Sequence, residues 1–277
     1  GYSVSFFLKD PVYYLEQYRI SQVLPTPAGG DYVRFSLTVA LFCVWCAYIW
    51  PVLHTRSLKW FTGFVMVVIA LYLHVLAVRT GLIALYMFVA GWGIFLGLRK
   101  SKLLGVGIIA FLIGAAYLGI NYVPTLKTRF GYLSYTYMMY MQGERTGNYS
   151  DMGRLISYSV AGKIIKRHPV TGVGAGDMLP AMQQGYKQWY PDVVPEKQLL
   201  PHNQFMVVWL GCGIVAFVIF VLWCFYPLKA MEKGREGFYL FIVWAILLLP
   251  LLVEPMLDVQ FGVFVYLFFL LWQKHQM

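Results

Sequence analysis

Residues 61–98 read FTGFVMVVIALYLHVLAVRTGLIALYMFVAGWGIFLGL and decide the fold class. Arg79 is the single formally charged residue in this stretch. A membrane span needs roughly 20 apolar residues, because about 30 Å of hydrocarbon is covered at about 1.5 Å per residue. The stretch therefore predicts two transmembrane helices, near 58–78 and 81–98, which meet at a tight corner formed by Arg79, Thr80 and Gly81.

The composition of the whole chain agrees with this reading. Of its 277 residues 60% are hydrophobic and 12% charged, whereas soluble domains carry about 25% charged residues. The bilayer is therefore the expected solvent. We predict an all-α integral membrane protein with about seven transmembrane helices, near 34–53, 58–78, 81–98, 103–123, 204–227, 238–253 and 259–273.

Lysines and arginines gather in alternate short loops of this topology. Short loops that hold them stay on the cytoplasmic side. The residues concerned are Arg56, Lys59, Arg99, Lys100, Lys102, Lys229, Lys233, Arg235 and Lys274. This orientation gives an outer segment 1–33, four spans in 34–123, a large outer loop 124–203, and three spans with a cytoplasmic C-terminus in 204–277.

The outer loop 124–203 retains a basic excess, which indicates either an anionic ligand or attraction to anionic lipid headgroups. Within it, Ile156, Val160 and Ile164 recur at helical spacing and predict an amphipathic helix over 151–167 that ends before Pro169. The segment 132–141 is rich in tyrosine and methionine and fits a segment lying in the membrane interface.

Arg79 is the first candidate for chemistry. An arginine at the outer membrane edge is costly to bury and needs a partner or a route to water. Its guanidinium presents paired donors to phosphate oxygens, which lysine cannot reproduce. Thr80 adds a hydroxyl, and Gly81 permits close backbone approach. The alternative is an interfacial arginine that only reaches toward the headgroups.

His202 is the second candidate and stands where the long loop meets the fifth predicted span. The positive end of that helix and nearby arginines disfavour the imidazolium form. A neutral imidazole is what a general base requires, and Asn203 could orient it or bind substrate. The alternative is an interfacial histidine with ordinary hydrogen bonds.

Arg154 is the third candidate, with Asp151 one helical turn before it. The two could form a surface ion pair of little energetic consequence, or Arg154 could act as a second phosphate ligand. Arg145, in the sequence Glu144-Arg145-Thr146-Gly147, is a weaker candidate for the same role.

Further candidates are a glycine-rich run in the outer loop and two carboxylates in the last hairpin. The glycine run 172–177, which contains Gly174 and Gly176, could form an anion-binding backbone nest or a plain turn. Glu254 and Asp258, at the outer end of the last hairpin, could hold an arginine or bind an acceptor. The sequence contains no metal-ligand motif, and we expect no metal and no cofactor.

Three motifs carry a resemblance when taken in order. They are Arg79-Thr80-Gly81; Asp151-x-x-Arg154 followed by Pro169-Val-Thr-Gly-Val-Gly-Ala-Gly176; and His202-Asn203 followed, after nine intervening residues, by Gly213. Together they resemble the superfamily of bacterial O-antigen ligases and O-antigen polymerases, over about residues 34–275. The ligase pattern ends in Gly, Thr or Tyr where this chain has Ala216, so the choice between ligase and polymerase stays open.

The resemblance implies a metal-independent, inverting glycosyltransferase of the bacterial inner membrane with its active site on the periplasmic face. Its donor would be a glycan on undecaprenyl diphosphate, and its acceptor lipid A-core or a growing glycan. Arg79 and Arg154 would bind the diphosphate, and His202 would deprotonate the attacking hydroxyl. Membrane lipids would be partners, and nucleic acid would not. Members usually have several more spans upstream, so we expect the chain, which begins at Gly1, to be the C-terminal part of a longer polypeptide.

O-antigen ligase is the first choice among the functions considered. The nearest alternatives are an O-antigen polymerase and a protein O-oligosaccharyltransferase of the same family. From other classes, a lipid or solute transporter would show half-repeats and midplane charges, and a structural membrane subunit would use the loop only to bind partners.

Replacing Arg79 by Lys tests the predicted arginine–phosphate contact. The substitution keeps the positive charge and removes the paired donors, so we expect glycan transfer to fall. The measurement is transfer from a lipid-linked glycan by the purified protein. Unaltered transfer by the Arg79→Lys variant would show that the paired donors are not needed.

Overall fold

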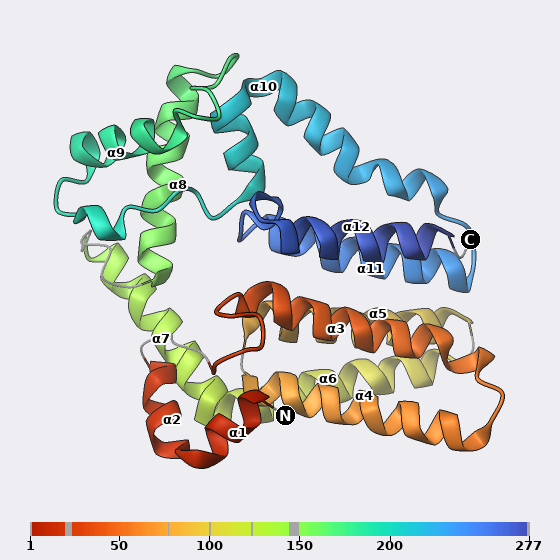
Figure 1. The fold of residues 1–277 in the computed structure, drawn as a ribbon. Helices are drawn as coiled ribbons and strands as arrows, with labels where there is room; N and C mark the ends of the chain where they lie inside the picture. The colour runs from red at the N-terminus through yellow and green to blue at the C-terminus, as the bar shows by residue number, and fades with distance from the viewer. Residues whose placement is uncertain are drawn as a thin grey trace. The chain divides into compact units, whose positions relative to one another are not determined.

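The computed structural model describes residues 2–19, 24–76, 78–99, 101–122, 124–143 and 150–275 (Figure 1). All regular structure in these ranges is helical, which confirms the predicted all-α class. The α-helices are α1 Tyr2–Lys9, α2 Pro11–Arg19, α3 Tyr32–Ile49, α4 Arg56–Leu76, α5 Arg79–Arg99, α6 Lys102–Tyr122, α7 Pro124–Met141, α8 Ser150–Arg167, α9 Met178–Trp189, α10 Gln204–Phe225, α11 Arg235–Leu251 and α12 Gln260–His275. Short 3-10 helices are η1 Trp50–Val52, η2 Pro195–Lys197, η3 Tyr226–Ala230 and η4 Met256–Asp258.

Each predicted span falls on a helix, but the helices differ in their capacity to cross a bilayer. Within the described ranges, four segments are long and apolar enough to do so: Tyr32–Val52, Arg56–Leu76, Arg79–Arg99 and Gln204–Ala230. The apolar helices Lys102–Leu118 and Gln260–Trp272 are shorter. The chain is therefore a multi-pass membrane protein, and the total of seven spans stays a prediction.

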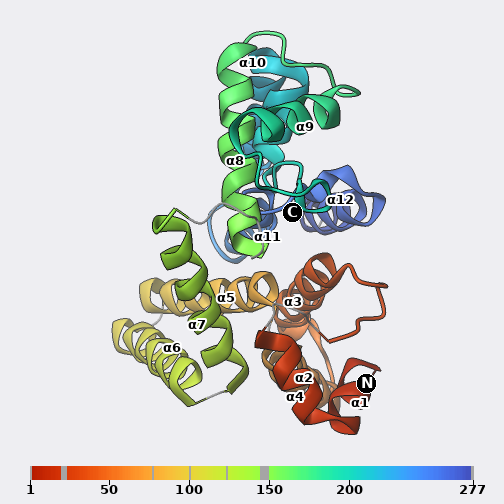
Figure 2. The ribbon, with the colours of Figure 1, turned by 90° about the vertical axis from the view of Figure 1, so that its left-hand side faces the viewer.

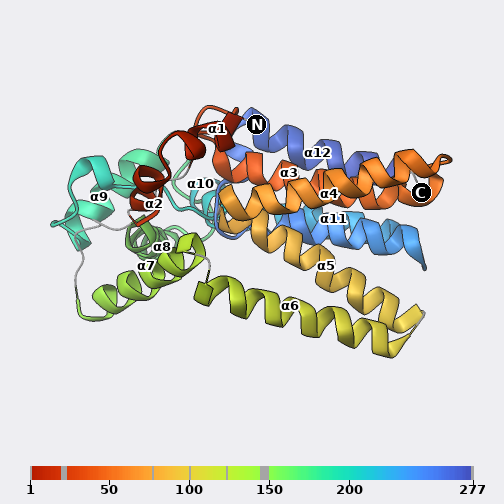
Figure 3. The ribbon, with the colours of Figure 1, turned by 90° about the horizontal axis from the view of Figure 1, so that it is seen from below.

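The chain forms two compact units. Unit 1 comprises residues 1–131, 231–246 and 264–277, and unit 2 comprises 132–230 and 247–263. In unit 1, helices α3 to α6 run alongside one another (Figure 3). A Cβ atom at Gly81 would lie 2.7 Å from Cβ of Ser36, so glycine is what allows α5 to approach α3 this closely. Gly81 thus serves helix packing, as small residues commonly do between membrane helices.

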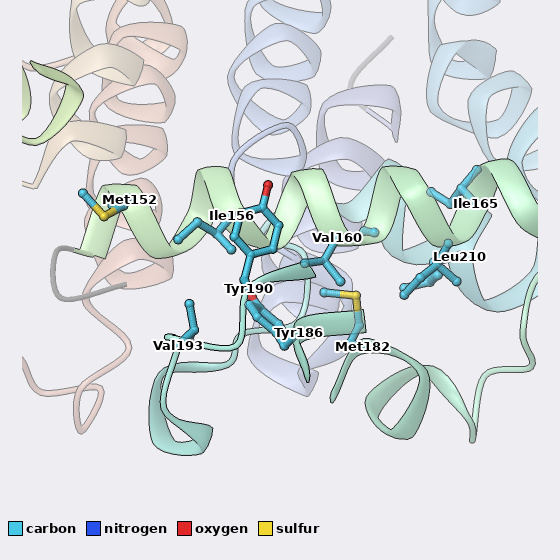
Figure 4. Packing of buried hydrophobic residues seen from close by; sticks show 11 residues of the cluster. Met152, Ile156, Val160, Ile165, Met182, Tyr186, Tyr190, Val193 and Leu210 are labelled. Carbon is cyan, nitrogen blue, oxygen red and sulfur yellow. The ribbon is translucent and has the colours of Figure 1, made fainter. Parts of the chain in front are cut away.

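Unit 2 is organised around α8, which confirms the predicted amphipathic helix. Ile156 and Val160 are completely buried and Ile164 nearly so. Helix α9 lies across this apolar face (Figure 2), and Met182 and Tyr186 of α9 pack into it (Figure 4). Each fully buried side chain of this kind contributes about 1.5–3 kcal/mol, so the core fixes the rotation of α8 firmly.

Helix α10 coincides with the predicted span 204–227, but it is broken at Gly213, a feature that the sequence did not indicate. Gly213 has φ 77° and ψ −174°, a backbone conformation used almost only by glycine, and α10 visibly changes direction (Figure 1). Before the break, α10 packs on α8 and contributes the buried Leu210 to the core around it. The first part of α10 is therefore a piece of unit 2's core.

The loop that follows α8 fills the break and satisfies its backbone. The N–H groups of Val173 and Gly174 donate to the carbonyls of Leu210 and Gly211 at 2.8 and 3.0 Å. The N–H of Ile214 donates to the carbonyl of Pro169 at 3.0 Å. These bonds replace helical ones that the break removes, which an apolar environment would otherwise penalise by several kcal/mol each.

Replacing Gly213 by Ala should destabilise the protein. A Cβ atom there would lie 1.9 Å from the Val170 carbonyl oxygen, and the backbone conformation alone costs a non-glycine residue about 1–3 kcal/mol. Gly162→Ala is the matched control, because its Cβ would meet open space on helix α8 and alanine is favoured there by about 0.5–1 kcal/mol. Thermal unfolding in detergent measures both. An unchanged melting temperature for Gly213→Ala would contradict the proposed role of the break.

Candidate functional site

The face of α8 opposite its core carries a polar group of side chains. Asp151, Arg154 and Tyr158 are spaced three and four residues apart, so they share this face. They meet His202, which precedes α10, and Glu254, which lies in the turn between α11 and η4. We call these five residues the Glu254 cluster, and all of them belong to unit 2.

Glu254 is the centre of this cluster because one carboxylate oxygen contacts both predicted site residues. Its Oε2 lies 3.0 Å from Nδ1 of His202 and 3.5 Å from Nη2 of Arg154. Arg154 also lies 3.9 Å from a carboxylate oxygen of Asp151. The Glu254 side chain is 15% exposed and that of Arg154 is 30% exposed. A carboxylate this sheltered is stabilised by having two cationic or hydrogen-bonding partners.

The main chain around His202 is held by two further hydrogen bonds. The Tyr158 hydroxyl donates to the His202 carbonyl at 2.6 Å. The Asn203 side chain caps α10 by accepting from the Met206 N–H at 3.0 Å, and it donates to the Leu252 carbonyl at 2.9 Å. Asn203 therefore links the start of α10 to the turn that carries Glu254.

Tyr158 remains a donor at physiological pH. Burial raises the pKa of its phenol above the ordinary value, the Arg154 guanidinium opposes that shift, and the carboxylates of Glu254 and Asp151 reinforce it. A raised pKa keeps the proton on the hydroxyl, so the bond to the His202 carbonyl persists across the neutral range.

This arrangement suits proton abstraction by His202. When Nδ1 donates to Glu254, Nε2 is left with a lone pair that can accept a proton from a hydroxyl group. Glu254 then stabilises the imidazolium that forms, as the carboxylate does in serine-protease triads. Glu254 was predicted as a possible partner of an arginine, which its contact with Arg154 confirms, whereas its contact with His202 was not predicted.

Arg79 and Thr80 occupy the first turn of α5, in unit 1, and both are half-buried. The structure therefore groups Arg154 with His202, while the participation of Arg79 in the same site stays a prediction. Arg145 lies outside the described residues.

The glycine run after α8 packs against α10. As described for the break, Gly174 donates its N–H to the Gly211 carbonyl, and its own carbonyl accepts from the Asp177 N–H at 3.1 Å. Gly176 lies in the same loop and is exposed. Anion binding by this run stays a prediction. The N–H groups of Val173 and Gly174 would not take part in it, because they donate to carbonyls of α10.

Sequence reasoning missed Tyr158 and Gln204. Tyr158 was accessible from the sequence, because it stands one helical turn after Arg154 on the same face. Gln204 was not, because its partners are more than 50 residues away in the chain. Among the residues that the structure describes, no group of three or more His, Cys, Asp or Glu side chains could hold a metal ion.

A comparison with known protein families supports the resemblance found in the sequence. A family model described as O-antigen ligase matches residues 64–221, more than half of the chain. The chain therefore belongs to the O-antigen ligase family, whose members are membrane glycosyltransferases. The match contains Arg79, Arg154 and His202, whereas Glu254 lies beyond it. No curated protein matches the chain.

Replacing Tyr158 by Phe should weaken the support of His202. The variant keeps the ring and removes the donor to the His202 carbonyl, at a net cost of about 0.5–1.5 kcal/mol. We expect a lower melting temperature than for Tyr137→Phe, a control on an exposed tyrosine of α7. Equal melting temperatures for the two variants would show that this hydrogen bond contributes nothing to stability.

Proposed function

We propose that this member of the O-antigen ligase family transfers a glycan from undecaprenyl diphosphate to lipid A-core, with inversion, at the periplasmic face of the inner membrane. Family membership supports glycosyl transfer from a lipid-linked glycan. The observation that carries the mechanism is the contact of Glu254 with both His202 and Arg154, at 3.0 and 3.5 Å.

His202 acts as the general base in this proposal. Nε2 takes the proton of the acceptor hydroxyl while the hydroxyl oxygen forms a bond to the anomeric carbon of the donor. The bond from that carbon to the diphosphate oxygen breaks, and undecaprenyl diphosphate leaves with the electron pair. Glu254 holds the ring through Nδ1 and balances the positive charge that the imidazole gains.

Arg154 stabilises the leaving diphosphate. Its contact with Glu254 is 3.5 Å, longer than the roughly 2.7–2.9 Å typical of strong charge-assisted bonds. A guanidinium has five N–H donors, so a partial contact with Glu254 and Asp151 leaves others for phosphate oxygens. Arginine charge then supplies the electrostatic stabilisation that divalent cations supply in other glycosyl and phosphoryl transfers.

Arg79 is proposed as the second diphosphate ligand, assisted by Thr80. Its position in the first turn of α5 suits this role, because the positive end of a helix favours an anion. In the proposed topology this end of α5 lies at the outer membrane surface, as does the loop region 124–203 that contains α8.

An O-antigen polymerase is the second candidate, favoured by Ala216 at the position where the ligase pattern has Gly, Thr or Tyr. A deletion strain separates the two functions. Polymer that accumulates on the lipid carrier indicates a ligase, whereas single repeat units on lipid A indicate a polymerase.

Replacing His202 by Ala tests the general base. Removal of such a base typically lowers the rate about 10²–10⁴-fold, so we expect a loss of this size in transfer by purified protein. His168→Ala is the matched control, because His168 is exposed at the end of α8, and it should retain full activity. A transfer rate of His202→Ala within about a few-fold of the rate of the unmodified protein would contradict the role of His202 as the base.

A further inference from the structure

We infer that Gln204 is a positioning residue that holds Glu254 against His202. This inference rests on the proposed function, since it concerns the alignment of the proposed base. Gln204 follows His202 by two residues and is the first residue of α10. Its side chain contacts the segment that carries Glu254, on the C-terminal side of that residue.

Both ends of the Gln204 amide are engaged. Nε2 donates to a carboxylate oxygen of Asp258 at 2.9 Å, and Oε1 accepts from the Leu257 N–H at 2.8 Å. The residue is 4% exposed. A buried amide is costly unless it is hydrogen-bonded, so these two bonds fix the side chain and the segment it contacts.

Asn203 completes the attachment on the other side of Glu254. Its Nδ2 donates to the Leu252 carbonyl at 2.9 Å. The two residues that directly follow His202 therefore hold the turn both before and after Glu254. Within the turn itself, Glu254 has local backbone bonds, from its N–H to the Pro250 carbonyl at 2.8 Å and from the Met256 N–H to its own carbonyl at 2.9 Å. The bonds from α10 set where this turn stands relative to His202.

Glutamine is the side chain that this position requires. It must donate to a carboxylate and accept from a backbone N–H at the same time, which an amide can do and a carboxylate or an apolar side chain cannot. The buried residues nearest to Gln204 on α10, apart from glycines, are the aliphatic Val207 and Leu210. A buried amide among them is costly unless its hydrogen bonds compensate for its burial.

The test is steady-state transfer by the full chain, with undecaprenyl-diphosphate-linked glycan and lipid A-core. Gln204→Met removes both hydrogen bonds at similar volume. Misplacement of a catalytic group by about 1 Å can cost as much as about 10²-fold in rate, so we expect kcat to fall about tenfold or more. The KM for the donor should change less than kcat, because Gln204 reaches the proposed diphosphate ligand Arg154 only through Glu254. Gln184→Met, at an exposed position of α9, is the control and should leave both constants unchanged.

A double-mutant cycle separates positioning from general stabilisation. If Gln204 acts through Glu254, Gln204→Met should cost little further activity in a Glu254→Ala background, with a coupling of about the size of its single-mutant effect. Independent losses that multiply in the double variant would overturn the inference.

A reciprocal exchange provides a second test that does not depend on the methionine variant folding. Gln204→Glu keeps the acceptor for Leu257 and places a carboxylate beside Asp258, so kcat should fall. In combination with Asp258→Asn, the new amide at position 258 can donate to the new carboxylate at position 204, so the hydrogen bond is restored in the opposite direction and kcat should recover. Recovery supports the inference, and a combined variant as slow as Gln204→Glu alone overturns it.

The outcomes also distinguish this inference from the proposed function. An inactive His202→Ala together with a fully active Gln204→Met overturns only the positioning role. Full transfer by His202→Ala overturns the proposed base, and the positioning role with it.

Discussion

The candidate site of unit 2 depends on one carboxylate. Glu254 contacts His202 and Arg154, which lie 52 and 100 residues from it in the chain. A sheltered carboxylate is unfavourable unless charges or donors compensate it, so the three residues are mutually dependent. Tyr158 donates to the His202 carbonyl, and Asn203, the next residue, donates to the Leu252 carbonyl, so these bonds hold the backbone where both contacts with Glu254 form.

Two features of the fold position Arg154 and His202 where both can contact Glu254. Helix α8 has an apolar face fixed by the core with α9 and a polar face that carries Arg154. Helix α10 is broken at Gly213, and its first part joins this core through Leu210. As a result His202 is positioned by a packed structure instead of by a loose loop. Catalytic groups held in this way need less reorganisation when the reaction begins.

The sequence predicted the features that depend on local periodicity. Apolar stretches located the helices at the predicted spans, and the spacing of Ile156 and Val160 located α8 and its buried face. Helices α1, α2 and α9 were not predicted. The break at Gly213 could not be read in this way, because it depends on a close approach of the loop after α8. The sequence likewise nominated His202, Arg154 and Glu254 separately, but the contact of one Glu254 oxygen with both other residues became evident only from tertiary contacts.

The most direct measurement is a structure of the protein with an undecaprenyl diphosphate analogue bound. The account predicts phosphate oxygens within hydrogen-bond distance of the Arg154 guanidinium, about 2.7–3.2 Å, a contribution from Arg79, and Nε2 of His202 facing the side from which an acceptor hydroxyl would attack. Diphosphate bound away from Arg154, with the imidazole unable to reach the anomeric position, would contradict it.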